Sequence, residues 1–104
     1  MNAFALATNL IFNDRHMAFD AIYRPGDAGD GHTVRVIKRA PDRLGNFGDG
    51  RFVSDSVLID VRVSEVAELQ PGDSFEIDGH RYEVRGEPVR DGERLVWAAE
   101  AREL

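Results

Sequence analysis

The side chains that most often do chemistry in proteins are sparse in this chain and form no recognisable motif. The three histidines, His16, His32 and His80, fall on different expected elements, and no two have the four-residue spacing of metal ligands on a helix. The absence of cysteine excludes disulfides, thiolate nucleophiles and cysteine-based zinc sites. No serine lies in a Gly-x-Ser-x-Gly sequence. We therefore expect no metal and no cofactor, and we do not expect an enzyme.

Glycine and aspartate recur over residues 26–31, GDAGDG, a composition that could suggest calcium or phosphate binding. The segment lacks the ligand register and the final glutamate of an EF-hand loop. No Gly-Lys-Ser/Thr sequence follows it, as a phosphate-binding loop would require. The segment is therefore predicted to be a flexible turn.

Most charged side chains follow a pattern that is not typical of a catalytic or metal site: acidic and basic residues alternate along strand-like segments. Arg81-Tyr82-Glu83-Val84-Arg85 is an example, and it is typical of the solvent face of a sheet with cross-strand ion pairs. The chain has 13 Lys and Arg against 19 Asp and Glu, a net charge of −6. This balance argues against a protein that wraps nucleic acid, because neutralising phosphates requires a basic surface.

The length of 104 residues and an apolar fraction of 42% predict a single globular domain over residues 1–104. No apolar run approaches the roughly 20 residues of a membrane-spanning helix. The first residues, MNAFALATNLIFNDRH, lack the basic segment that opens a secretion signal. We expect no contact with a membrane.

Six segments have the apolar periodicity and β-branched composition of strands, and they must carry any functional surface. They span residues 17–24, 32–39, 56–64, 74–78, 80–87 and 93–102. The side chains that share an inward parity on the last four segments are Val57, Ile59, Val61, Val63, Phe75, Ile77, Tyr82, Val84, Leu95, Trp97 and Ala99. The segment 64–69 is predicted to form one helical turn.

The last three segments are predicted to form a meander, because tight-turn signals separate them. Asp78-Gly79 is the strongest short signal for a two-residue type I′ hairpin, and Asp91-Gly92 predicts a second tight turn. Six short strands with no long helix between them favour a mainly β fold, a small six-stranded β-barrel or sandwich.

A short helix is predicted ahead of the strands, over about residues 2–13. Phe4, Ala7, Leu10 and Ile11 share one face at helical spacing. About three turns are marginal in isolation, so this helix must dock on something. Either it covers one end of the core or it docks on a partner subunit.

A long glycine-rich loop is predicted over residues 40–52. Six of the ten glycines lie between Gly26 and Gly50, and the loop has no apolar period although it contains Leu44 and Phe47. Ordering glycine-rich backbone costs more entropy than ordering any other, so we expect the loop to be mobile until a partner compensates for that cost. The loop is either a plain connection between two strands or an anchor for a partner.

Motifs along the chain carry a resemblance to a known family. They are Ala21-Ile22-Tyr23-Arg24-Pro25-Gly26, Pro71-Gly72-Asp73, Phe75-Glu76-Ile77-Asp78-Gly79, Tyr82-Glu83-Val84 and Leu95-Val96-Trp97. In order and spacing these motifs resemble the head–tail joining proteins of tailed phages, also called head completion or stopper proteins. The resemblance covers nearly the whole chain.

This resemblance implies a structural virion protein built as a small β-barrel with a flanking helix. Such proteins form a ring, expected to be six-fold, beneath the portal and adaptor proteins, where the ring closes the DNA-filled head. The ring presents a surface for the tail, whose terminator and tube proteins would be the partners on that side. The implied location is the virion, and the host cytoplasm during assembly.

The candidate interface residues come from the helix and the loop. The loop offers an apolar pair with charged companions, and the helix offers its apolar face: Arg43, Leu44, Phe47 and Arg51 in the loop, and Phe4, Leu10 and Ile11 in the helix.

A rival reading from another class is a barrel of the OB or SH3 type that binds nucleic acid or a small ligand. It predicts a basic, aromatic-rich strand face. The outward residues here are mixed in sign and most aromatic residues have inward parity, so the structural reading is preferred.

Overall fold

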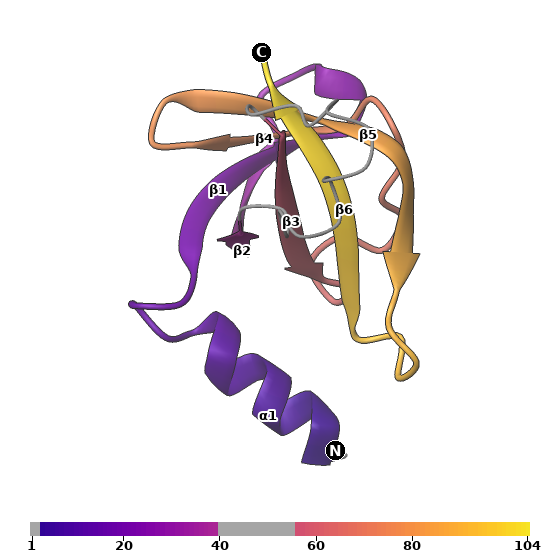
Figure 1. Ribbon diagram of the computed structural model, residues 1–104. Coiled ribbons are helices and arrows are strands. Elements are labelled where there is room, and N and C mark those ends of the chain that lie inside the picture. The colour runs from indigo at the N-terminus through magenta and orange to yellow at the C-terminus, as the bar shows by residue number, and fades with distance from the viewer. Residues whose placement is uncertain (1–2, 40–55) are drawn as a thin grey trace, which may run out of the picture.

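The computed structural model describes residues 3–39 and 56–104, most of them in strands (Figure 1). In chain order the described elements are α1 (Ala3–Phe12), β1 (Phe19–Arg24), the 3₁₀ turn η1 (Pro25–Asp27), β2 (His32–Arg39), β3 (Ser56–Arg62), β4 (Ser74–Ile77), β5 (His80–Arg90) and β6 (Val96–Glu103).

The strands close into a barrel in the order β1-β2-β3-β6-β5-β4, with every neighbouring pair antiparallel. The closing ladder joins β1 to β4, where Tyr23 lies opposite Phe75. Closure pairs the edges that an open sheet would offer to other chains. The predicted mainly β fold with a short N-terminal helix is confirmed, and of its two alternatives the barrel is correct.

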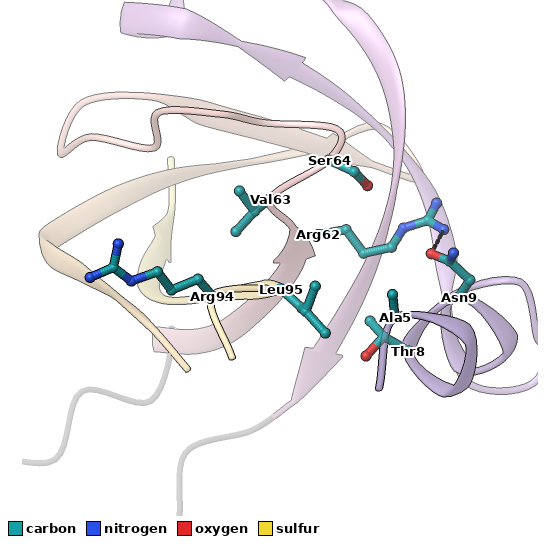
Figure 2. Close-up of a pocket in the computed structure, with 8 residues that line it drawn as sticks. All are labelled: Ala5, Thr8, Asn9, Arg62, Val63, Ser64, Arg94 and Leu95. Atoms are coloured by element: carbon teal, nitrogen blue, oxygen red, sulfur yellow. Dashed lines mark hydrogen bonds between the residues drawn. The ribbon is translucent and has the colours of Figure 1, made fainter. Parts of the chain in front are cut away.

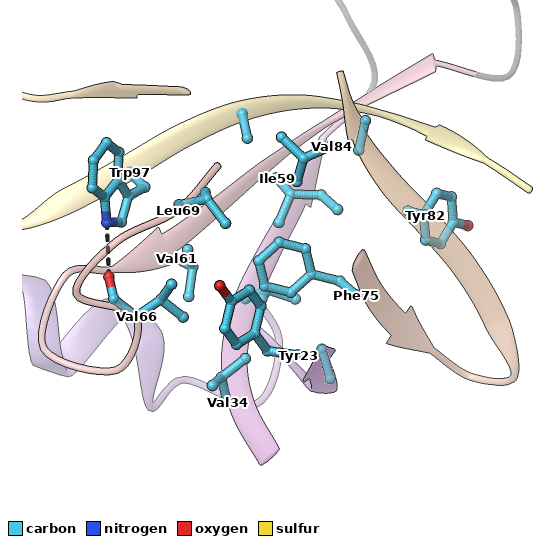
Figure 3. Close-up of a cluster of buried hydrophobic side chains, with 14 of the residues drawn as sticks. Tyr23, Val34, Ile59, Val61, Val66, Leu69, Phe75, Tyr82, Val84 and Trp97 are labelled. Atoms are coloured by element: carbon cyan, nitrogen blue, oxygen red, sulfur yellow. Dashed lines mark hydrogen bonds between the residues drawn. The ribbon is translucent and has the colours of Figure 1, made fainter. Parts of the chain in front are cut away.

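Alternate strand residues point into the barrel and form one apolar core (Figure 3). The inward parity predicted for the strands is confirmed by burial of Ile59, Val61, Phe75, Ile77, Tyr82, Val84, Trp97 and Ala99. The other three predicted residues, Val57, Val63 and Leu95, are only half-buried. The indole Nε1 of Trp97 donates a hydrogen bond to the carbonyl of Val66 at 2.8 Å. Trp97 is thus a core residue whose polar atom is satisfied.

The two predicted Asp-Gly turns are both present, but their connections differ in length. Asp78 and Gly79 have φ of 52° and 81°, the positive values that a type I′ turn needs, and they join β4 to β5 directly. The predicted second tight turn at Asp91-Gly92 is confirmed as a four-residue turn over residues 91–94, which lies within a longer loop. The connection runs over residues 91–95 and has its positive φ at Arg94, 58°.

The side chain of Asp91 explains the longer connection. Its Oδ1 accepts hydrogen bonds from the backbone N–H of Leu95 at 2.8 Å and of Val96 at 3.4 Å. The N–H of Arg94 donates to the carbonyl of Asp91 at 3.0 Å, which closes a four-residue turn inside the loop. An aspartate that binds backbone N–H groups ahead of it stabilises this longer connection over a two-residue hairpin loop.

The strand β5 extends to Arg90, three residues beyond the predicted end at Glu87. The register against β6 shifts between Arg85 and Val89, and Gly86 has a φ of 70° within that irregular stretch. Glycine accepts such a conformation without a steric penalty, so the strand bends and resumes its pairing. Gly86, which lies inside the predicted strand, thus marks a bulge.

The single helical turn predicted at 64–69 is present, but it begins earlier, at Arg62. The N–H of Val66 donates to the carbonyl of Arg62 at 3.1 Å, which makes one turn, and no helix continues from it. Burial of Val66 and Leu69 in the core takes the chain across the end of the barrel instead.

Candidate assembly surface

The helix α1 turns its large apolar side chains to solvent, which is the opposite of the usual arrangement in a surface helix. Its sequence, AFALATNLIF, contains no charged residue. The side facing solvent carries exposed Phe4, Leu6, Leu10 and Ile11, which are 60%, 52%, 66% and 46% accessible. A surface helix ordinarily turns its polar residues to water and its apolar stripe to the core. We call these four residues the outer helix face.

The three helix residues predicted for an interface, Phe4, Leu10 and Ile11, all belong to the outer helix face. The helix itself does lie against the barrel, but through Phe12, which is 3% accessible, and not through this apolar face. Leu6 was missed although it stands four residues before Leu10, a spacing that places both on one side of a helix.

Polar contacts attach the inner side of α1 to the barrel. Arg62 of β3 donates from Nη1 to the side-chain oxygen of Asn9 at 2.9 Å. The same guanidinium lies over the ring of Phe12, with 5.4 Å between its Cζ and the ring centre. Glu65 accepts from Nε and Nη2 of Arg62 at 3.1 and 2.6 Å, which fixes the direction of the arginine. The helix is therefore held by the oriented guanidinium group of Arg62 rather than by a broad apolar contact.

Arg35 of β2 holds the end of the helix and the chain that follows. Its Nε donates to the carbonyl of Phe12 at 2.9 Å, the last residue of α1. Its Nη2 lies within hydrogen-bond distance of the carbonyls of Asp14, 3.3 Å, and Ala18, 3.2 Å. Its Nη1 pairs with Asp20, the residue opposite it on β1, at 3.0 Å. A cation at the C-terminus of a helix also interacts favourably with the helix dipole.

The sequence offered no signal that singled out these anchors. Arg35, Arg62 and Glu65 resemble the other alternating charges, and only the position of α1 across the barrel brings them together with the helix.

A pocket of about 220 Å³ opens between α1 and the end of the barrel (Figure 2). Ala5 and Thr8 line it from the helix, and Val63 and Leu95 line it from the segments beside β3 and β6. Figure 2 shows the side chain of Leu95 directed toward the helix and the guanidinium of Arg94 directed away from it. Asn9, Arg62, Ser64 and Arg94 complete the lining, which includes no carboxylate and no imidazole.

The outer surface of the strands carries paired charges of both signs. Nη2 of Arg39 lies 2.9 Å from Oδ1 of Asp60, and Nη1 of Arg24 lies 2.8 Å from Oε1 of Glu76. Of the five aromatic rings on the described strands, only Phe19 is exposed, and the other four are buried: Tyr23, Phe75, Tyr82 and Trp97. The described strands therefore do not form the basic, aromatic-rich face of the rival reading.

The Pro71-Gly72-Asp73 motif has a structural role. Asp73 is 5% accessible and accepts hydrogen bonds from the hydroxyl of Tyr23 at 2.6 Å and from the N–H of Gly26 at 2.8 Å. Burial, together with the hydrogen bond and negative charge of Asp73, raises the pKa of the Tyr23 hydroxyl above its ordinary value. The motif ties the turn before β4 to the end of β1.

A second network joins the 26–31 segment to the barrel. Asp27 accepts a hydrogen bond from the hydroxyl of Ser74 at 2.6 Å and pairs with Arg81. The Ser74 hydrogen bond, with a further contribution from Arg81, lowers the pKa of the Asp27 carboxyl. The segment predicted to be a flexible turn begins with η1, and these contacts hold η1 in place.

The remaining predicted interface residues, Arg43, Leu44, Phe47 and Arg51, lie outside the described residues, as does the whole predicted loop 40–52. Within 3–39 and 56–104, no three His, Asp or Glu side chains gather closely enough to hold a metal ion. No helix in that part of the chain has the length and apolar character of a membrane span.

The described residues form a closed barrel whose N-terminal helix presents an uncharged apolar face to solvent, a surface suited to contact with another protein. Residues 1–101 match the family model of the phage head-tail attachment protein. The chain belongs to this family. It is a virion component of a structural rather than enzymatic family, and its partners are components of the phage head and tail.

A solved structure supports the fold. The chain is similar to the solution structure of protein SF1141 from Shigella flexneri 2a, with a TM-score of 0.66 and 14% sequence identity. The match covers 84% of this chain and 92% of that one. No match was found among curated proteins.

Proposed function

We propose that this protein closes the DNA-filled phage head as a ring beneath the portal and adaptor proteins and presents the docking surface for the tail. The outer helix face carries the proposal, because a head-tail attachment protein needs a surface that other virion proteins cover. A six-fold ring would meet the tail terminator and tube proteins on its far side.

The outer helix face has the chemistry of a protein contact. Burying one Leu, Ile or Phe side chain contributes about 1.5–3 kcal/mol. The helix has no charged residue, so a partner that covers this face removes no helix charge from water. The unusual polarity of α1 thus favours association while the barrel remains folded.

The glycine-rich segment supplies the second proposed contact. Leu44 and Phe47 would act as apolar anchors, with Arg43 and Arg51 as charged companions, because apolar side chains in a segment without periodicity have no predicted place in the core. The net charge of −6 suits a ring through which DNA passes, since an acidic lumen repels phosphate.

The test replaces one exposed leucine in a phage whose own copy of the gene is deleted. We expect Leu10→Ser to leave the fold intact and to lower the yield of tailed particles about tenfold, the effect of losing roughly 1.4 kcal/mol of contact energy. Val89→Ser is the matched control, because Val89 is equally exposed, 65% against 66%, but lies on β5. Electron microscopy counts filled heads without tails.

Phe47→Ser examines the loop contact in the same assay and is expected to lower the particle yield in a similar way. A normal yield from Leu10→Ser would remove the outer helix face from the proposal, and a normal yield from Phe47→Ser would remove the loop anchor.

A further inference from the structure

The lining of the pocket between α1 and the end of the barrel carries positive charge. It includes two arginines, Arg62 and Arg94, and the hydroxyl groups of Thr8 and Ser64. The charge of Arg62 is neutralised within the protein, because a carboxylate oxygen of Glu65 lies 2.6 Å from its guanidinium. Arg94 forms no ion pair with any residue in the described part of the chain. The pocket therefore has one cation without a counter-charge.

The backbone of Arg94 has a conformation that arginine seldom adopts. Its φ is 58°, in the left-handed region, where most residues with a side chain are strained. The other non-glycine residues with a positive φ in the described ranges are Asp27 and Asp78, and aspartate tolerates this region better. Gly92, in the same loop, has no positive φ, although glycine adopts one without penalty. The loop thus places its strained conformation at an arginine rather than at its glycine.

Asp91 keeps Arg94 in that conformation. The N–H of Arg94 donates to the carbonyl of Asp91 at 3.0 Å, and the carboxylate of Asp91 accepts from the N–H of Leu95 at 2.8 Å. Strained backbone that its surroundings maintain is found preferentially at functional sites. Arg94 is exposed, and Figure 2 shows its guanidinium extending away from the helix. The loop therefore fixes the backbone of a free, exposed arginine beside the pocket.

We propose that this pocket binds a glutamate or aspartate side chain of the head or tail protein that covers the outer helix face, with Arg94 as its cationic partner. The inference rests on the proposed function and identifies one contact of that partner. Ala5 lines the pocket and the next residue, Leu6, belongs to the outer helix face, so the two sites adjoin on α1. A carboxylate only accepts hydrogen bonds, which suits a lining that supplies guanidinium and hydroxyl donors.

A carboxylate fits this site better than a phosphate of DNA. Proteins that bind duplex DNA neutralise several phosphates at once, because these lie at short intervals along the helix. Here the pocket offers a single free cation, and the chain has a net charge of −6. A volume of about 220 Å³ with one free arginine beside it matches one inserted acidic side chain.

The test separates the charge of Arg94 from its backbone strain. Arg94→Asn removes the charge and introduces a residue that tolerates a positive φ. We expect the purified variant to be at least as stable to urea as the parent protein, so a loss of attachment would not come from misfolding. DNA-filled heads from a phage that lacks this gene are mixed with purified protein and with tails, and electron microscopy counts the tailed particles.

We expect Arg94→Asn to lower the yield of tailed particles about tenfold, which corresponds to 1.4 kcal/mol. Arg94→Lys should restore part of the yield, because lysine keeps the charge but lacks the planar pair of donors. Arg90→Gln is the control, since Arg90 is also exposed but lies over the ring of Trp97, outside this pocket. A normal yield with Arg94→Asn, or an equal loss with Arg90→Gln, would overturn the inference.

A role in binding DNA is tested separately. Short duplex DNA is mixed with the parent protein and with Arg94→Asn at physiological ionic strength, and we expect neither to bind. Binding by the parent protein that Arg94→Asn loses would assign the arginine to phosphate, and the proposed carboxylate contact would be wrong.

The Leu10→Ser variant separates this contact from the proposed function. If Arg94→Asn gives a normal yield while Leu10→Ser loses tailed particles, the inference is wrong and the outer helix face still binds a virion protein. If Arg94→Asn loses tailed particles while Leu10→Ser gives a normal yield, the contact at the pocket stands and the attachment role of that face is wrong.

Discussion

The barrel and the helix α1 distribute polarity in opposite ways. In the barrel, Ile59, Val61 and Phe75 are fully buried, while the outward positions carry paired charges. In the helix, leucine and phenylalanine face water, while Asn9 faces the barrel and binds Arg62. The barrel thus buries its apolar side chains within its own core, whereas the helix leaves its apolar side chains exposed, where another protein can cover them.

The two regions are also held by different forces. The barrel depends on burial of apolar surface and on a closed ladder of backbone hydrogen bonds. The helix depends on two arginines, Arg35 and Arg62, which bind its terminal carbonyl and its one amide side chain. A protein built in this way can fold as a monomer and still retain a surface whose burial favours assembly.

The largest expected effect compares one phenylalanine from each region. Phe75 has no accessible surface, so Phe75→Ala should lower the free energy of unfolding by about 3–5 kcal/mol. Phe4 is 60% accessible, so Phe4→Ala should change the free energy of unfolding by less than about 0.5 kcal/mol. Urea unfolding followed by tryptophan fluorescence measures both. Equal losses would mean that the outer helix face contributes to the fold.

A smaller and local effect is expected when the attachment of the helix is weakened. Arg35→Gln removes charged hydrogen bonds to the carbonyls of Phe12 and Ala18, each worth about 1.5–3 kcal/mol. Amide hydrogen exchange in α1 should accelerate about tenfold or more, while exchange in the barrel strands stays nearly unchanged.

The matched control for that variant is Arg39→Gln, which removes an arginine of the same strand that pairs with Asp60 instead. It should leave exchange in α1 unchanged. If both variants loosen the helix equally, the attachment does not run through Arg35.

The smallest expected effect is the pH dependence of stability that comes from a charged residue on the barrel surface. The helix α1 has no charged residue and therefore no such effect. The pKa of Asp27 is lower in the folded protein than its ordinary value of 3.8. Its ionised form therefore stabilises the fold above about pH 4, and this contribution is lost as the pH falls through the lower folded value.

The measurement is urea unfolding of Asp27→Asn and of the parent protein from pH 7 to pH 2. The difference in stability between them should shrink as the medium becomes acidic, and the exposed Asp30→Asn serves as the control substitution. A difference that stays constant with pH would show that the ionisation of Asp27 does not contribute.

Much of the barrel could be predicted from the chain alone, because alternation along a strand and the Asp78-Gly79 turn are local properties. The fold departs from the local pattern where a side chain lengthens a connection or a bulge extends a strand. Asp91 binds the backbone N–H groups of Leu95 and Val96 and lengthens a connection, and Gly86 allows β5 to continue through a bulge.

The candidate surface could be predicted only in part. The helical spacing of Phe4, Leu10 and Ile11 identified one apolar face, and the structure places all three in solvent. The anchors Arg35 and Arg62 could not be identified, because their contacts with α1 cross 23 and 53 positions of the chain. The assignment of Leu44 and Phe47 remains a prediction.

The amino-acid sequence determined which residues share a side of each strand and of the helix, because those sides follow from the period of the backbone. It also determined the family, through the order and spacing of its motifs. Only the tertiary structure decided that β1 closes on β4 and that α1 turns its apolar side to water. A helical period shows which residues lie together, but the direction they face depends on contacts with distant strands.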